Sequence, residues 1–231
     1  MGPLGNAAEY SAEYSADYVS EDAALRTARA NAADLGGTEP VRPQVGAALR
    51  FIASAVGART VVEVGTGCGS SGIWLLRGMR QGGTLTSVDT EPEYHRMARR
   101  SFTAAGFAAN QSRLILGRAL DVLPRLSDGA YDLVFCDVDP GAYADYLIAA
   151  MRLLRPGGVV VFNNVLAAPG SIDATSAAVP DQDRDYYGQY PGEAAEEASA
   201  ELDVASMVRD DERLVPMLLP LGDGLLAAVK R

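Results

Sequence analysis

The chain of 231 residues carries 30 acidic and 20 basic side chains, a formal net charge of −10 and a sequence pI near 4.6. This excess of negative charge argues against nucleic acids and anionic membrane surfaces as partners. Hydrophobic residues make up 48% of the chain, which is enough for one sizeable core, so the length predicts a single α/β domain.

The N-terminal segment is predicted to be distinct from the domain that follows it. Residues 1–37 read as a tail and one helix over about 20–35, which Gly36 and Gly37 end as a C-terminal cap would. Three tyrosines are spaced four residues apart and would form one stripe on a helix: Tyr10, Tyr14 and Tyr18. The stripe either docks on the body or a second subunit, or belongs to a partly ordered tail. Residues 38–231 form the predicted binding domain.

Within this domain, short apolar strands alternate with helices. The predicted strands cover residues 60–64, 84–88, 113–116, 131–136 and 159–162. The predicted helices cover residues 43–56, 71–80, 90–105, a segment ending at 126, and 142–154. Apolar strands in this rhythm are typical of a parallel sheet that is covered on both faces. The run Arg155-Pro156-Gly157-Gly158 predicts a turn before the last of these strands.

The end of the chain breaks this rhythm. A long loop from 163 to about 191 and a helix over about 193–208 precede two apolar segments, 214–219 and 225–229. The turn Pro220-Leu221-Gly222-Asp223-Gly224 joins them. They predict an antiparallel hairpin that closes a mostly parallel, seven-stranded sheet. Dinucleotide dehydrogenases do not usually end in this way.

The glycine-rich loop after the first strand predicts a nucleotide site. Three alternating glycines follow the strand: Gly65, Gly67 and Gly69. Glycine tolerates positive φ and lets the backbone approach a ligand, toward which the next helix points its N–H groups. The spacing to Gly72 also satisfies the dinucleotide fingerprint, with Asp89 as the ribose-binding acid. However, Glu63 would then lie near a pyrophosphate, and it is better suited to S-adenosylmethionine, which carries an ammonium, a sulfonium and no phosphate.

Several motifs together indicate a family. They are Val64 to Ser71, Tyr131 to Asp137, Leu153 to Gly158, Asn163 to Leu166 and Leu221 to Leu225. On these motifs the domain resembles the cation-dependent, catechol-O-methyltransferase-like family of small O-methyltransferases. The resemblance implies a Rossmann-like class I methyltransferase fold with a C-terminal antiparallel hairpin, S-adenosylmethionine as methyl donor, and a homodimer.

The resemblance also implies a set of cofactor-binding residues. They are Val41, Glu63, Gly65, Thr66, Gly67, Ser71, Asp89, Ala119 and Asp137. Asp89 fits on separate grounds, because it ends the second strand beside the loop, where a carboxylate can accept from both ribose hydroxyls. Its alternative role is that of a helix N-terminal charge, which the helix dipole favours.

The chain departs from the family pattern where the resemblance implies a metal and a base. The cation site would consist of Asp137, Asn163 and Asn164, with one carboxylate where the family has two, so we expect binding of Mg²⁺ or Ca²⁺ to be weak or absent. Pro140 replaces the family's catalytic lysine. Asp137 and Asp139 are the nearest carboxylates that could accept the acceptor's proton, although Asp139 could instead cap the following helix.

Two functions from different classes therefore remain open. The first is an S-adenosylmethionine-dependent O-methyltransferase acting on a small acceptor such as a phenol, with weak or absent metal dependence. The second is a non-catalytic S-adenosylmethionine-binding protein, and a nicotinamide-dependent oxidoreductase is a third reading. Tyrosines in the long loop either cover an aromatic acceptor or are ordinary exposed side chains: Tyr186, Tyr187 and Tyr190.

The sequence also predicts the compartment. Cys68 and Cys136 are too few for a disulfide framework, which favours a reduced, cytoplasmic protein. The first basic residue is Arg26, so we expect no signal peptide. We also expect no membrane span, because no apolar stretch is long enough to cross a bilayer.

Overall fold

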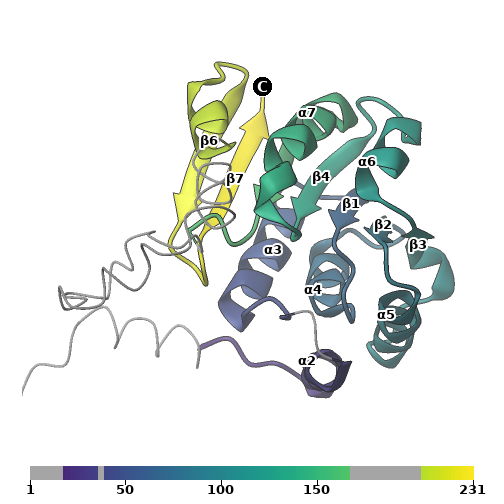
Figure 1. Cartoon of the computed structure of the whole chain (residues 1–231). Coiled ribbons are helices and arrows are strands. Elements are labelled where there is room, and N and C mark those ends of the chain that lie inside the picture. Colours follow the sequence, from purple (N-terminus) through teal and green to yellow (C-terminus); the bar gives the residue numbers. More distant parts are fainter. Residues whose placement is uncertain (1–17, 36–38, 167–203) are drawn as a thin grey trace, which may run out of the picture.

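The computed structural model of the chain describes residues 18–35, 39–166 and 204–231 (Figure 1). Its helices are α2 (Ala23–Leu35), α3 (Pro43–Ala55), α4 (Ser70–Gly78), α5 (Pro92–Ala104), α6 (Ala119–Val122) and α7 (Tyr143–Leu153), and residues 204–210 are also helical. Its strands are β1 (Thr60–Val64), β2 (Thr84–Asp89), β3 (Ser112–Leu116), β4 (Tyr131–Cys136), β5 (Leu154–Phe162), β6 (Leu214–Leu219) and β7 (Leu225–Lys230). Tyr10, Tyr14 and the tyrosines of the long loop lie outside the described residues.

The strands form one seven-stranded sheet in the order β3-β2-β1-β4-β5-β7-β6. Strands β1 to β5 pair in parallel, whereas β7 runs antiparallel to both β5 and β6. The predicted mostly parallel, seven-stranded sheet with its C-terminal antiparallel hairpin is therefore confirmed. Adjacent residues of β1 point to opposite faces of the sheet, and Val61 and Val62 are both fully buried. Both faces of the sheet are therefore covered, as the continuous apolar strands predict.

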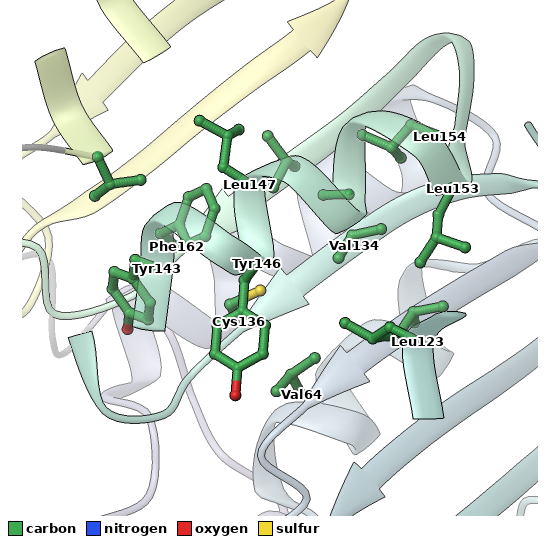
Figure 2. Packing of buried hydrophobic residues seen from close by; sticks show 14 of the residues in the cluster. Val64, Leu123, Val134, Cys136, Tyr143, Tyr146, Leu147, Leu153, Leu154 and Phe162 are labelled. Atoms are coloured by element: carbon green, nitrogen blue, oxygen red, sulfur yellow. The ribbon is translucent and has the colours of Figure 1, made fainter. Parts of the chain in front are cut away.

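Helices cover both faces of the sheet, each over its own core (Figure 1). Helices α2 to α5 pack over the face that carries Val61, and α6 and α7 pack over the face that carries Val62. In the second core the Tyr143 and Phe162 rings lie side by side, with centroids 5.0 Å apart (Figure 2). This contact ties α7 to the end of β5, beside the motif Asn163-Asn164.

Two predicted boundaries are wrong, both for local reasons. Strand β5 begins at Leu154, so the predicted turn at residues 155–158 lies inside it as an irregularity, and Gly157 supplies the bend with a φ of 76°. The helix predicted to end at residue 126 is only the four-residue α6, followed by the 3-10 helix η2 (Leu123–Arg125). Pro124 accounts for the change, because proline cannot donate an α-helical hydrogen bond.

Helix α2 contributes to the main body. Its residues Leu25 and Ala28 are fully buried and belong to the same core as Val61 of β1. This helix therefore has no core of its own, although the sequence analysis assigns it to a segment separate from the domain. The division of the chain at residue 37 stays a prediction.

Candidate functional site

The glycine-rich loop joins β1 to α4 at the carboxyl end of the parallel sheet. Strands β1 and β4 are neighbours there, and the chain leaves them in opposite directions, which is where open α/β sheets bind ligands. Gly65 has a φ of 93°, and a Cβ on it would lie well inside contact distance of the main-chain oxygen of Asp137. Only glycine fits at this position, because the loop needs both a positive φ and this close approach.

A cavity of about 280 Å³ lies against this loop. It contains most of the predicted cofactor-binding residues: Val41, Gly65, Thr66, Gly67, Ser71, Asp89 and Asp137. A second cavity of about 430 Å³ adjoins it, sharing Gly65, Asp89, Val138 and Asp139, and contains the predicted residue Ala119. The two cavities together extend along the ends of β1, β2 and β4, which is an elongated space suited to a nucleoside with a side chain.

Asp89 braces the loop with its carboxylate. Its Oδ2 accepts the backbone N–H groups of Thr66 and Gly67 at 2.9 and 3.0 Å, and its Oδ1 accepts that of Glu91 at 3.0 Å. A carboxylate has about four acceptor sites, so these bonds use three and leave one on Oδ1 for a ligand hydroxyl. The binding of both ribose hydroxyls by Asp89 stays a prediction. The loop-bracing role was not predicted.

Glu63 differs from the other predicted cofactor-binding residues because it lines neither cavity. Its side chain is fully buried, with 0% exposure, and lies behind the cavity wall. Oε1 accepts the hydroxyl of Ser71 and Oε2 that of Ser87, each at 2.6 Å. Burial is the main cause that raises the pKa of Glu63 to about 7, and the two serine hydrogen bonds oppose that shift. Hydrogen bonds connect this carboxylate to the cavity wall at Ser71 and, through Ser87, at Thr66.

The charged side chains of the first cavity are all acidic: Glu39, Asp89, Asp137 and Asp139. A wall of one sign attracts ligands of the opposite sign. In the same wall, the hydroxyl of Ser70 is buried and has no hydrogen-bond partner. A buried polar group without a partner costs free energy, so a polar ligand atom would relieve that cost. These features fit the cationic methyl donor that the sequence predicts.

The three predicted metal ligands do come together at the ends of β4 and β5. The amide nitrogens of Asn163 and Asn164 donate to Oδ1 of Asp137 at 2.9 and 3.4 Å. Asn164 adopts a φ of 57°, and the Oδ1 atom of Asn163 is buried without a partner. The amides thus present N–H groups, not oxygens, to the carboxylate. Within the described ranges no group of three acidic, histidine or cysteine side chains could hold a metal ion.

In this orientation the two amides give the carboxylate hydrogen bonds and not additional oxygen ligands, whereas a magnesium-type ion requires several oxygen ligands in octahedral geometry. Burial raises the pKa of Asp137 to about 6, and the hydrogen bond from Asn163 opposes that shift. The only lysine, Lys230, is engaged elsewhere, because its Nζ donates to the main-chain oxygens of Met151 and Leu154. Leu154 begins β5, at the amino end of the parallel strands, whereas Asp137 follows the carboxyl end of β4.

Asp139 lines both cavities but is exposed, and its carboxylate has a local partner. Its Oδ1 accepts the backbone N–H of Gly141 at 2.9 Å, which closes the turn at η3 (Pro140–Ala142) before α7 begins. Asp139 therefore caps the turn at η3, whereas α7 itself begins after Ala142 without a side-chain cap. The role of Asp139 as a base stays a prediction.

Sequence reasoning missed several wall residues: Ala32, Glu39, Pro40, Cys68, Ser70, Tyr94 and Val138. Cys68 and Ser70 lie within the glycine-rich loop and could have been found there. Ala32 could not be found in this way, because nothing in the sequence of α2 indicates that this residue reaches the cavity at the carboxyl end of the sheet.

Comparison with known proteins agrees with this site. The family described as O-methyltransferase matches residues 11–231. A protein of Mycobacterium ulcerans (strain Agy99), named "Putative O-methyltransferase", is 44% identical over 228 residues, which cover 99% of this chain and 94% of that protein. A solved structure from Corynebacterium glutamicum has 32% identity and a TM-score of 0.79, covering 97% of each chain. The O-methyltransferase of Bacillus cereus, solved in complex with SAH, has 24% identity and a TM-score of 0.77, covering 96% of this chain and 97% of that one.

The chain therefore belongs to the O-methyltransferase family. The predicted enzyme class is confirmed, and it is the class on which the glycine-rich loop, the acidic cavity and the C-terminal hairpin all converge. In the part of the chain that the structure describes, no helix has the length and apolar character needed to span a membrane.

Proposed function

We propose that the protein transfers a methyl group from S-adenosylmethionine to a hydroxyl of a small acceptor of the phenol class, with weak or absent dependence on divalent cations. The cofactor assignment is supported by the acidic cavity against the glycine-rich loop, by family membership, and by the SAH held by the Bacillus cereus enzyme of the same fold.

The chain's own residues would bind and orient the donor. Thr66, Gly67 and Ser71 line the cavity beside the N-terminal end of α4, and Asp89 holds the loop in place from β2. When bound, S-adenosylmethionine supplies an electrophilic methyl group. The transfer then needs chiefly alignment of the acceptor oxygen with that group, and alignment alone contributes several kcal/mol to a rate enhancement.

The second requirement is a deprotonated acceptor. Asp137 is the carboxylate best suited to accept the proton, because it is partly buried in the cavity wall and its pKa is raised to about 6. A base works best when its pKa lies near the working pH. Above pH 6 the group is ionised and can accept the proton, and below that pH the activity should fall. Asp139 is the second candidate base.

One observation carries the proposed metal behaviour. Both amides donate N–H groups to Asp137, so the carboxylate is already compensated by hydrogen bonds that a metal would have to replace. Asp137 is also the only acidic member of the three. Both facts weaken binding of a hard cation, whose affinity follows the number of charged oxygen ligands.

The test is methyl transfer from S-adenosylmethionine to a panel of phenols, with and without a chelator, in wild type and Asn163→Asp. We expect wild-type activity to survive the chelator, and the variant to bind Mg²⁺ or Ca²⁺ more tightly by calorimetry. Asn110→Asp is the matched control, because it makes the same substitution at an exposed position outside the predicted metal site. Wild-type activity that the chelator abolishes would contradict the proposal. Cofactor binding without transfer to any phenol would instead support the non-catalytic alternative.

We also infer a homodimer that works in the cytoplasm. The edge strand β6 and its neighbour β7 expose apolar side chains that a second copy could cover: Val215, Met217, Leu218 and Val229. Both cysteines are free and buried, which suits a reducing compartment. Light scattering at micromolar concentration should give twice the monomer mass of 24.3 kDa, and the monomer mass would contradict the dimer.

A further inference from the structure

A chain of hydrogen bonds runs behind the cofactor cavity. Glu63 accepts the hydroxyls of Ser71 and Ser87, and the hydroxyl oxygens of Ser87 and Thr66 lie 2.7 Å apart. Glu63, Ser87 and the hydrogen bonds between them are buried, whereas Thr66 and Ser71 form part of the cavity wall. The network therefore begins and ends at the cavity and has one ionisable group at its centre.

The ionisation state of Glu63 decides which way these hydroxyls point their protons. An ionised carboxylate only accepts, so Ser71 and Ser87 must each give it their single proton. Since Ser87 then has no proton left, Thr66 is the donor in the bond between them. Any hydrogen bond that the hydroxyl of Ser71 or Thr66 makes with a ligand in the cavity must therefore be one that it accepts. Protonation of Glu63 would turn one serine around and make a wall hydroxyl a donor.

Among the described residues, the charged groups that act most strongly on Glu63 are Asp89 at the end of β2 and Asp137 at the end of β4, and both are negative. Its direct partners, Ser71 from α4 and Ser87 from β2, are neutral. Burial and these two carboxylates raise the pKa of Glu63 to about 7. A cation bound in the cavity would stabilise the ionised form.

We propose that Glu63 is a positioning residue that makes Ser71 and Thr66 obligatory acceptors, so that the cavity selects a ligand by its ammonium group and releases a proton from Glu63 when that ligand binds. The proposal rests on the proposed binding of S-adenosylmethionine, whose methionine part carries an ammonium. It adds a specificity determinant that does not touch the ligand, and a pH dependence of binding.

The sign of that dependence follows from linkage. A bound ammonium lowers the pKa of Glu63, so below pH 7 the complex holds fewer protons than the free protein, and affinity rises with pH. One coupled group allows at most a tenfold change in affinity per pH unit. The slope should level off above pH 7, where Glu63 is ionised before binding.

The experiment is calorimetry of wild type and Glu63→Gln with SAH and with its deaminated analogue, from pH 6 to 8, in two buffers of different ionisation enthalpy. Wild type should prefer SAH over the analogue at least tenfold and release a proton near pH 6.5. Glu63→Gln should lose most of that preference and the proton release, because glutamine must donate to one serine. Asp137 is present in both proteins, so the difference between them isolates Glu63.

Glu212→Gln is the matched control, because it makes the same substitution at an exposed position that lies outside the network and lines neither cofactor cavity. It should retain the proton release and the preference for the ammonium. Thermal unfolding distinguishes a positioning role from a role in folding. Because the pKa of Glu63 is raised in the folded protein, its ionisation lowers the stability of the wild type as the pH rises toward 7. Glu63→Gln should therefore be at least as stable as wild type at pH 8.

Unchanged ammonium preference and unchanged proton release in Glu63→Gln would overturn this inference. Failure of wild type to bind SAH at any pH would overturn the proposed function instead. The two failures are therefore distinguishable.

Discussion

The two halves of the sheet's carboxyl edge hold their carboxylates in different ways. On the β1–β2 side, Asp89 is fixed by three backbone N–H groups of the loop and of the start of α5. On the β4–β5 side, Asp137 is held by side-chain amides of Asn163 and Asn164. Backbone donors are present whatever the side chains are, whereas side-chain amides disappear with a single substitution.

This difference indicates in which half of the carboxyl edge the side chains can change without loss of the fold. In the proposed function the β1–β2 side would bind the methyl donor, and its geometry is built into the loop. The β4–β5 side would face the reacting end, where the chemistry depends on the identities of a few side chains. The departures from the family pattern that the sequence resemblance implies, at Pro140 and Asn163, lie on that second side.

The largest effect should come from breaking the backbone side at Gly65. Gly65→Ala introduces a Cβ into the main-chain oxygen of Asp137 at a φ of 93°, and should lower the free energy of unfolding by about 2–4 kcal/mol. Chemical denaturation measures this change. Gly82→Ala is the control, because Gly82 has a φ of 79° and no atom within 4 Å of a Cβ, so it should cost only about 1 kcal/mol. Equal costs at the two sites would show that the close approach does not matter.

A smaller effect is expected from removing the carboxylate that braces the loop. Asp89→Ala removes the acceptor of three N–H groups and should weaken S-adenosylmethionine binding by about 1.5–3 kcal/mol, the range for hydrogen bonds to charged groups. Calorimetry gives the affinity, with Asp89→Asn as a control that retains one acceptor oxygen. If affinity is unchanged in Asp89→Ala, the residue is only a helix-end charge.

On the β4–β5 side, Tyr143 positions the motif Asn163-Asn164 from α7. Its buried hydroxyl donates to the main-chain oxygen of Asn163 at 2.7 Å (Figure 2 shows the ring beside Phe162). Tyr143→Phe should lower the free energy of unfolding by about 1 kcal/mol, because the carbonyl loses its donor. Tyr146→Phe on the same helix is the control. A change no larger than that of the control would mean that this hydrogen bond contributes nothing measurable.

The smallest effect should come from Asp139. Asp139→Ala removes one exposed acceptor from the turn before α7 and should cost about 0.5–1 kcal/mol of stability, with methyl transfer nearly unchanged. Steady-state kinetics at pH 7 decides the matter. A fall in kcat of about a hundredfold or more is the effect of losing a general base, and it would assign that role to Asp139 and not to Asp137.

Much of the fold could be predicted because its signals are local. Alternating apolar strands and helices, the glycines after β1 and the hairpin near Gly222 indicated the sheet and its closing strands, and family membership followed from short motifs. The errors were local as well: Pro124 shortened one helix, and β5 extended through Gly157. A turn signal identifies a bend, but it cannot say whether strand pairing resumes on both sides of it.

The sequence by itself determined the sheet, the loop and which chemical groups lie at the carboxyl edge, since these depend on periodicity and on residue type. Only the tertiary structure decided what each group faces. In the structure Glu63 contacts Ser71 and Ser87 and lines neither cavity. Asp89 accepts hydrogen bonds from the loop, and the amides of Asn163 and Asn164 donate to Asp137. Hydrogen-bond partners such as Ser87 and Glu63 come from different strands, 24 residues apart, so their pairing depends on strand register, which no local pattern contains.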